Sequence, residues 1–467
     1  MAVLEQQIEM LEQSAPLELR GTVVEVRGLA LRVADLPVPV GAMVRVVGRG
    51  AGRDQLQLLV EGEVVGFDED VTIVMPFGEL NGIKRGDKVI ATQFAQYVRV
   101  GESVLGRVLD GLGRPIDGLG PLAETVSRPL NPKPVDPLNR PRIDEALATG
   151  VRAVDGMMSV GRGQRMGVFA APGMGKSTLL GMMAKHTAAD VSVIALVGER
   201  GREVRDFIEG TLGPEGMARS VVVAATSDEP ALVRIRCAMV ATAIAEYFRD
   251  EGMDVLLIMD SVTRFCQAQR QVGLAAGEPP TTKGFPPSTF AMLPRMLERS
   301  GRTETGSITG LYSILVEGDD MTEPVADACR GILDGHIQLS KKLAEQGHYP
   351  AIDVLGSVSR VADDVTMVDQ QKARQEVVKL LASYAQVEDL LNIGAYTIGS
   401  NPDFDLAIAC KPAIDQVLQQ GREYKEELRN FGNTRGMFLA LAGKIEEARK
   451  QLKQQQVGMQ ESTPLPQ

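Results

Sequence analysis

The sequence contains no tryptophan and only three histidines, and aromatic residues make up 4% of it. Its four cysteines are widely separated and include no CxxC pair, which argues against a structural zinc site and favours reduced, buried thiols. No run approaches the roughly 18 apolar residues that span a bilayer. Three glutamates interrupt the first 12 residues, so a basic region followed by an apolar signal core is also missing. We therefore expect a cytoplasmic protein.

Positive charge is also in deficit, because 50 lysines and arginines face 61 aspartates and glutamates, giving a net charge of -11. A large basic surface for nucleic acid is not expected, although a local basic groove is compatible with this balance. The 467 residues are too many for one compact domain and suggest about three.

The first segment, residues 1–18, is predicted to be an amphipathic helix. Leu4, Ile8 and Leu11 fall on one helical face, and Pro16 closes the segment. An isolated helix this short is marginal in water, so it either docks on another surface or frays.

Residues 19–98 predict a small closed β-barrel, which we expect to tie neighbouring subunits into a ring. Six short β-prone runs separated by glycine carry this prediction: 22–26, 30–33, 43–47, 55–60, 63–67 and 71–75. Residues 99–368 begin with a Pro/Gly-rich connection and continue with alternating apolar strands and helices, which is typical of an α/β domain with a parallel sheet. Helix formers dominate residues 369–456, and residues 457–467 are predicted to be a disordered tail.

A phosphate-binding loop follows the apolar run 166–170 and opens a helical segment. It consists of Ala171, Pro172, Gly173, Met174, Gly175, Lys176, Ser177 and Thr178. Strand, tight loop and helix in this order are the context of a P-loop, whose backbone N–H groups wrap the phosphates of ATP. We expect Lys176 to reach the β- and γ-phosphates and the Ser177 hydroxyl to ligate Mg²⁺. Ala170 replaces the first glycine of the general pattern, which is possible if its φ is negative.

Two further apolar runs end in carboxylates. Residues 255–260 end in Asp260, where a P-loop enzyme needs an acid to position Mg²⁺ through its water shell. Residues 191–197 lead into Glu199, and a carboxylate at the end of a strand beside the nucleotide can polarise the attacking water. From the pattern alone, a solvated surface position for Glu199 is an equally good interpretation.

Several longer stretches together resemble one family. They are residues 106–110, 149–155, 161–165, 198–205, 284–288, 317–320, 347–353 and 357–360. Over about residues 21–420, the chain resembles the ring ATPases related to the rotary ATP synthase alpha and beta subunits, and most closely the flagellar and type III secretion ATPases. This resemblance implies a RecA-like P-loop ATPase core, with the small β-barrel before it and a helical domain after it.

The resemblance also implies roles for individual residues. Glu199 corresponds to the general base, Arg200 to a γ-phosphate contact and Glu203 to a supporting acid. Tyr349 is similar to the aromatic residue that stacks on adenine. Arg360 resembles the arginine finger that enters the neighbouring subunit's site, where a guanidinium stabilises charge on the phosphoryl oxygens. Because base and finger lie on one chain, the resemblance implies a ring of identical subunits, a homohexamer.

The implied partners are a stator-like regulator at the N-terminal helix, a central stalk protein, export-gate membrane proteins and substrate–chaperone complexes. The implied location is the cytoplasmic face of an inner-membrane export apparatus. The favoured hypothesis is therefore an ATP-driven export motor, and the sequence of residues 317–361 favours a flagellar one.

Three alternatives remain at this point. One is a catalytic subunit of a rotary ATP synthase coupled to ion flow. A second is a Rho-like RNA translocase, which would need a basic RNA platform rich in aromatic residues. The third is a ring component that does not hydrolyse ATP.

Overall fold

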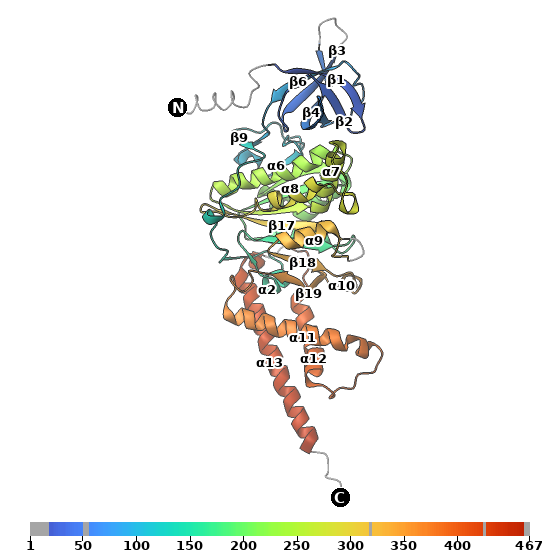
Figure 1. Cartoon of the computed structure of the whole chain (residues 1–467). Coiled ribbons are helices and arrows are strands. Elements are labelled where there is room, and N and C mark those ends of the chain that lie inside the picture. Colours follow the sequence, from blue (N-terminus) through green and yellow to red (C-terminus); the bar gives the residue numbers. More distant parts are fainter. Residues whose placement is uncertain (1–17, 50–55, 317–319, 424–425, 462–467) are drawn as a thin grey trace.

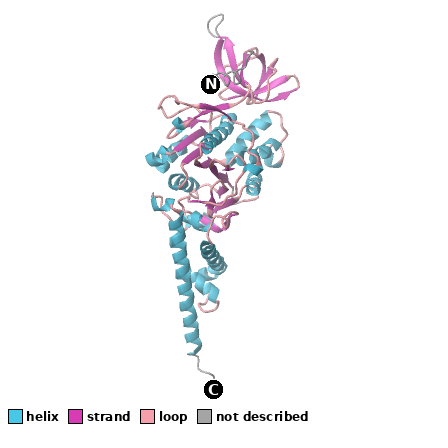
Figure 2. Cartoon of the chain, turned by 90° about the vertical axis from the view of Figure 1, so that its left-hand side faces the viewer, coloured by secondary structure: helices cyan, strands magenta, loops and turns pink. Residues whose placement is uncertain are grey.

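The computed structural model describes residues 18–49, 56–316, 320–423 and 426–461, so the helix predicted over residues 1–18 lies outside the described residues except for its last position. A barrel, a layered core and a group of helices follow one another along the molecule (Figure 1). The last helix projects well away from the core (Figure 2). Among the described residues, no helix combines the length and apolar character needed to cross a membrane.

The N-terminal part is a closed antiparallel barrel with the strand order β1-β2-β5-β4-β3-β6. Its strands are β1 (Arg20–Arg27), β2 (Ala30–Ala34), β3 (Met43–Arg49), β4 (Leu56–Asp68), β5 (Val71–Pro76) and β6 (Lys88–Gln93). The barrel is thus as expected, but two of its strands are not. The runs 55–60 and 63–67 form the single strand β4, which pairs through Gly62 without a break in the strand. The sequence prediction also missed β6, which closes the barrel against β1 and β3.

The core is built on a nine-stranded sheet whose main order is β19-β18-β12-β17-β15-β13-β14-β8. Its strands are β8 (Val108–Asp110), β12 (Arg165–Ala170), β13 (Val191–Glu199), β14 (Ser220–Thr226), β15 (Asp254–Asp260), β16 (Gly301–Arg302), β17 (Ser307–Leu315), β18 (Gly335–Leu339) and β19 (Ile352–Ser359). From β18 to β8 along this order the strands are parallel, whereas β19 and β16 pair antiparallel. The carboxyl ends of β12, β13 and β15 therefore meet at one edge, the usual place of a ligand site in such sheets.

Helices cover both faces of this sheet, as near-continuous apolar strands require. They are α2 (Arg152–Met157), α3 (Lys176–His186), α4 (Gly201–Arg205), the π-helical turn η3 (Asp206–Leu212), α5 (Gly213–Ala218), α6 (Ala231–Asp250), α7 (Val262–Ala275), α8 (Pro287–Leu297), α9 (Pro324–Ile332) and α10 (Lys341–Glu345). Two short two-stranded sheets lie outside the main sheet. One pairs β7 (Tyr97–Val100) with β9 (Val126–Pro129), and the other pairs β10 (Ala146–Leu147) with β11 (Val160–Gly161).

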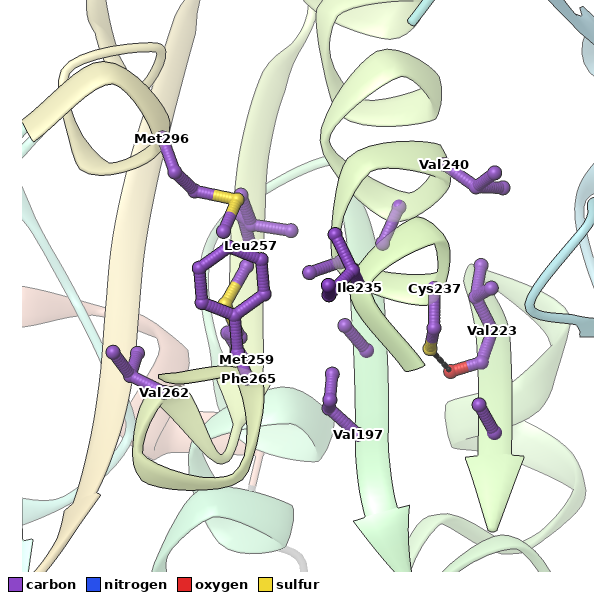
Figure 3. Packing of buried hydrophobic residues seen from close by; sticks show 14 of the residues in the cluster. Val197, Val223, Ile235, Cys237, Val240, Leu257, Met259, Val262, Phe265 and Met296 are labelled. Atoms are coloured by element: carbon purple, nitrogen blue, oxygen red, sulfur yellow. Dashed lines mark hydrogen bonds between the residues drawn. The ribbon is translucent and has the colours of Figure 1, made fainter. Parts of the chain in front are cut away.

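One large apolar cluster fixes the carboxyl end of β15 between α6 and α7. Ile235 and Phe265 are buried against Leu257 and Met259 of this strand (Figure 3). The thiol of Cys237 donates to the Val223 carbonyl oxygen at 3.3 Å. All four cysteines are buried and unbridged, which confirms that expectation.

The C-terminal part consists of α11 (Val368–Asn392), α12 (Pro402–Leu418) and α13 (Phe431–Glu461). It packs on α2 so closely that a Cβ at Gly156 would lie 1.9 Å from the Phe438 ring. Helix α13 continues to Glu461, past residue 456, where the sequence prediction places the end of the helical part. No proline interrupts the helix formers of this stretch before Pro464.

Candidate active site

The P-loop has the backbone that its sequence predicts. Ala170 is the last residue of β12 and is not among the residues with positive φ, so the condition for alanine at this position is met. Gly173 and Gly175 have φ values of 86° and 87°, in the left-handed region that favours glycine. Gly175 is the N-cap of α3, and Lys176 is the first residue of this helix. The N–H groups of the first turn therefore remain available for phosphate oxygens.

A cavity of about 140 Å³ lies at the carboxyl ends of β13 and β15; we call it the catalytic cavity. It brings together five of the predicted site residues from four different elements: Ser177, Thr178, Glu199, Glu203 and Asp260. It is lined by Ser177, Thr178, Leu196, Glu199, Glu203, Val204, Asp206, Phe207, Thr211 and Asp260.

The P-loop lysine is held by the acid at the end of β15. Lys176 Nζ lies 2.5 Å from Asp260 Oδ1, and the two side chains are only 10% and 3% exposed. If either partner of an ion pair buried to this degree is lost, the other remains as an uncompensated buried charge, which is strongly destabilising. Because phosphate oxygens are also anionic, the Lys176 ammonium can exchange Asp260 for a nucleotide phosphate without becoming an unpaired buried charge.

The surroundings of Glu199, the predicted base, change its ionisation. Burial, a hydrogen bond to Glu203 and the nearby Asp260 carboxylate raise its pKa to about 8. The same hydrogen bond lowers the pKa of Glu203, whose carboxylate accepts the hydrogen bond that the protonated Glu199 carboxyl donates. A base is most effective when its pKa lies near the working pH, so the shift suits Glu199 to proton transfer.

A cation that the sequence analysis did not identify completes this group. Arg264 places Nη2 3.3 Å from Glu199 Oε2, and its guanidinium also donates to the Gly198 carbonyl oxygen. Arg264 lies in the first turn of α7, whose N-cap Ser261 directly follows Asp260. The sequence could have indicated Arg264, because it follows Asp260 by four residues. A helix that begins directly after β15 places its first turn at the same edge of the sheet as Asp260.

Magnesium is the ion that these groups fit. The Ser177 hydroxyl and the Asp260 carboxylate line one cavity beside the P-loop. Hard oxygen donors suit Mg²⁺, which is usually held by one or two protein oxygens together with waters and substrate phosphates.

Tyr349 lines a second cavity beside the P-loop, with a volume of about 200 Å³. Its ring would be 3.6 Å from a Cβ at Gly175, and it remains 46% exposed. Apolar side chains form most of this cavity, and the segment after α12 adds polar ones, which suits an adenine ring. The lining residues are Met174, Gly175, Thr178, Leu179, Met182, Leu339, Tyr349, Pro350, Ala351, Gln420, Gly421 and Arg422.

Two of the predicted catalytic residues, Arg200 and Arg360, contact neither the catalytic cavity nor the P-loop cavity of Tyr349. The Arg200 side chain is 77% exposed, pairs with Glu203 at 3.4 Å and does not line the cavity, so its γ-phosphate contact stays a prediction. Arg360 follows β19 at the edge of the sheet and lines a third cavity of about 420 Å³, which shares no residue with the other two. Within one subunit the predicted finger residue Arg360 and the predicted base Glu199 therefore line separate cavities.

Comparisons with known proteins identify the family. The nucleotide-binding domain of the ATP synthase alpha/beta family matches residues 150–359, and the beta-barrel domain of that family matches residues 20–93. The C-terminal domain of the type III secretion ATPase EscN matches residues 366–431. The chain belongs to the type III secretion and flagellar ATPases. This confirms the predicted ATPase activity and the three-part fold, and it favours the export ATPases over a rotary synthase subunit or an RNA translocase.

Individual relatives agree with this assignment. The chain is 52% identical over 414 residues to a type 3 secretion system ATPase of Xanthomonas euvesicatoria, covering 89% of this chain and 92% of that one. It is 48% identical over 421 residues to the flagellum-specific ATP synthase of Bacillus subtilis, covering 89% and 94%. The assembled ATPase EscN of enteropathogenic E. coli matches with a TM-score of 0.83 and 41% identity, covering 90% and 99%. A structure of EscN in complex with its central stalk EscO matches with a TM-score of 0.81 and 40% identity over 90% and 99%.

Proposed function

We propose that this export ATPase works as a homohexameric ring in which each catalytic site is completed by the neighbouring subunit. The observation that supports this most is the separation of Arg360 from Lys176 and Glu199 within one subunit. In the described part of the chain, the Arg360 guanidinium has no hydrogen bond or ion pair, although its backbone N–H donates to Asp334. An exposed guanidinium that forms no ion pair with the described residues of its own subunit fits a contact outside that subunit.

The side chains of one site divide the chemistry of ATP hydrolysis between them. Water attacks the γ-phosphorus while the bond to the β-phosphate oxygen breaks, and Glu199 accepts a proton from the attacking water. Lys176, Arg264 and the neighbour's Arg360 stabilise the charge that develops on the phosphoryl oxygens. Ser177 and Asp260 would hold Mg²⁺, which neutralises phosphate charge when it is bound.

Mixed rings test whether the site is shared. Arg360→Ala subunits keep a working P-loop, and Lys176→Ala subunits keep a working finger, but each variant alone should be inactive. A ring that contains both should recover part of the activity wherever a Lys176→Ala subunit presents Arg360 to an Arg360→Ala neighbour. If rings shown to contain both variants recover no activity, the shared site is wrong.

The proposed role in the cell is to couple hydrolysis to the release and export of substrates, at the inner-membrane apparatus. EscN binds a central stalk, EscO, and we propose an equivalent stalk here. A stator-like regulator at residues 1–18, export-gate membrane proteins and substrate–chaperone complexes complete the proposed set of partners. Nucleic acid is not among them.

A flagellar relative and a secretion-system relative match at 48% and 52% identity, and these values are too similar to separate the two systems. The proposed flagellar role therefore rests on the sequence of residues 317–361. Deletion of the gene tests it. Loss of motility with normal effector secretion supports the flagellar role, and the opposite result excludes it. Complementation with Lys176→Ala, which should fail, shows whether ATP turnover is the function that was lost.

A further inference from the structure

The cavity that contains Arg360 has a second arginine, which the catalytic account above does not use. Arg330 lies on α9, near its C-terminal end, and lines the same space of about 420 Å³. Its side chain is 41% exposed, and Nη2 donates to Asp327 Oδ1, one turn earlier in the helix, at 3.0 Å. This is a single surface ion pair, which holds the guanidinium only weakly.

Gly335 and His336 of β18 line this cavity together with the two arginines. His336 is fixed by a 3.0 Å hydrogen bond between Nε2 and the Gly356 carbonyl oxygen, and its ring packs edge-on to Phe169. Burial, together with Arg330 and Arg360, lowers the pKa of His336, which favours the neutral form of the ring. A Cβ at Gly335 would lie 2.4 Å from the Val358 carbonyl oxygen, which shows how closely β18 and β19 approach beneath the two arginines.

The charges of the cavity do not balance. Two guanidiniums, those of Arg330 and Arg360, line the cavity together with one carboxylate, that of Asp327. Arginines with the same charge in one cavity repel each other, and an anion placed between them relieves that repulsion. Guanidiniums bind phosphate oxygens through two parallel N–H donors, so a polyphosphate is an anion that this arrangement suits.

We propose that Arg330 is a second cation which, with Arg360, reaches the phosphates of the nucleotide bound to the neighbouring subunit. This inference rests on the shared site proposed above, because it places the Arg360 cavity against the neighbour's P-loop. Asp327 then orients the Arg330 side chain along α9 until the phosphates arrive. The neighbour's nucleotide is thus contacted by one arginine from α9 and one that follows β19.

The test compares Arg330→Ala with Arg330→Lys and with Arg295→Ala, an exposed arginine of α8 that lines none of the three cavities. In assembled rings, Arg330→Ala should lower kcat by about 10²-fold, the scale of one lost charge-stabilising donor. Binding of a labelled ATP analogue to dilute, unassembled subunits should be unchanged, because the contact is made by another subunit. Lysine should restore activity only in part, since it lacks the planar pair of donors. Arg295→Ala should behave like wild type.

Mixed rings then show where Arg330 acts. Arg330→Ala subunits mixed with equimolar Lys176→Ala should form complete sites at about one quarter of the interfaces of a randomly assembled ring, and activity should recover accordingly. If Arg330→Ala is as active as Arg295→Ala, the inference is overturned. It is also overturned if a higher protein concentration removes the whole defect, because Arg330 would then contact the neighbour's protein.

The control for the trans arrangement is the Arg360→Ala and Lys176→Ala mixture. If this control mixture recovers activity and the Arg330→Ala mixture does not, the proposed role of Arg330 is overturned, whereas the shared site stands. Failure of both mixtures overturns the shared site, and the inference on Arg330 with it.

Discussion

The pH dependence of ATP hydrolysis should be controlled by Glu199, whose pKa is raised to about 8 by burial, by its hydrogen bond to Glu203 and by Asp260. A carboxyl group accepts a proton only when it is ionised, so a raised pKa means that activity is lost as the pH falls below that value. At about pH 7, roughly one subunit in ten carries an ionised Glu199 before ATP binds. Because kcat/KM reports ionisations of the unliganded enzyme, it should rise about tenfold between pH 7 and 9 and then level off.

The assay is phosphate release at ATP concentrations below KM across this pH range. In Glu199→Gln the amide keeps the size of the side chain but cannot accept the proton, so turnover should fall by about 10²–10⁴-fold and lose this pH dependence, while ATP still binds. Glu203→Gln is the matched control: the base remains, but no carboxylate holds its proton, so the inflection should move to lower pH. A wild-type profile that is flat between these pH values, or a Glu199→Gln variant with near wild-type turnover, would refute the reasoning.

Four further outcomes are expected. Lys176→Ala should weaken nucleotide binding and abolish hydrolysis together, measured by titration with labelled ATP and by phosphate release. Arg264→Ala should keep ATP binding but lose on the order of 10²-fold in turnover, because a cation beside the base and the phosphates is gone; unchanged turnover would exclude this role. Burial raises the pKa of Asp155 to about 7, so the folded state binds more protons than the unfolded state between about pH 4 and pH 7, and the free energy of unfolding should fall as the pH rises through this window. Denaturant unfolding of wild type against Asp155→Asn isolates that contribution, and a stability difference that does not change with pH would contradict it. Removal of residues 1–16 should leave ATP binding intact but change the set of co-purified partners; identical partners and oligomers would show that the segment frays.

The P-loop and its acids could be predicted because their chemistry depends on short-range geometry. A strand that ends at Ala170 and a helix that begins at Lys176 fix the loop between them, whatever the rest of the chain does. Asp260 and Glu199 each end a buried strand, and parallel strands bring such ends to one edge of the sheet. The local pattern was sufficient for the P-loop, whereas for Glu199 it left a surface position open, and only the family resemblance favoured the role of base.

Features that depend on contacts between distant segments were harder to predict. Strand β4 was divided in two because Glu61 and Gly62 interrupt its apolar pattern, although pairing with both neighbours keeps it continuous. Arg264 was missed because the salt bridge to Glu199 joins residues that are far apart in sequence. The exposure of Arg200 could not be read from the residues beside it, because it depends on how α4 leaves the sheet.

The specific ATPase activity of the wild-type chain, measured against protein concentration with the assembled fraction determined in the same samples, tests the shared site most directly. A subunit by itself lacks the neighbour's Arg360, so activity per subunit should rise in proportion to the assembled fraction and reach a plateau when assembly is complete. Constant specific activity down to concentrations at which only single subunits remain would contradict the account.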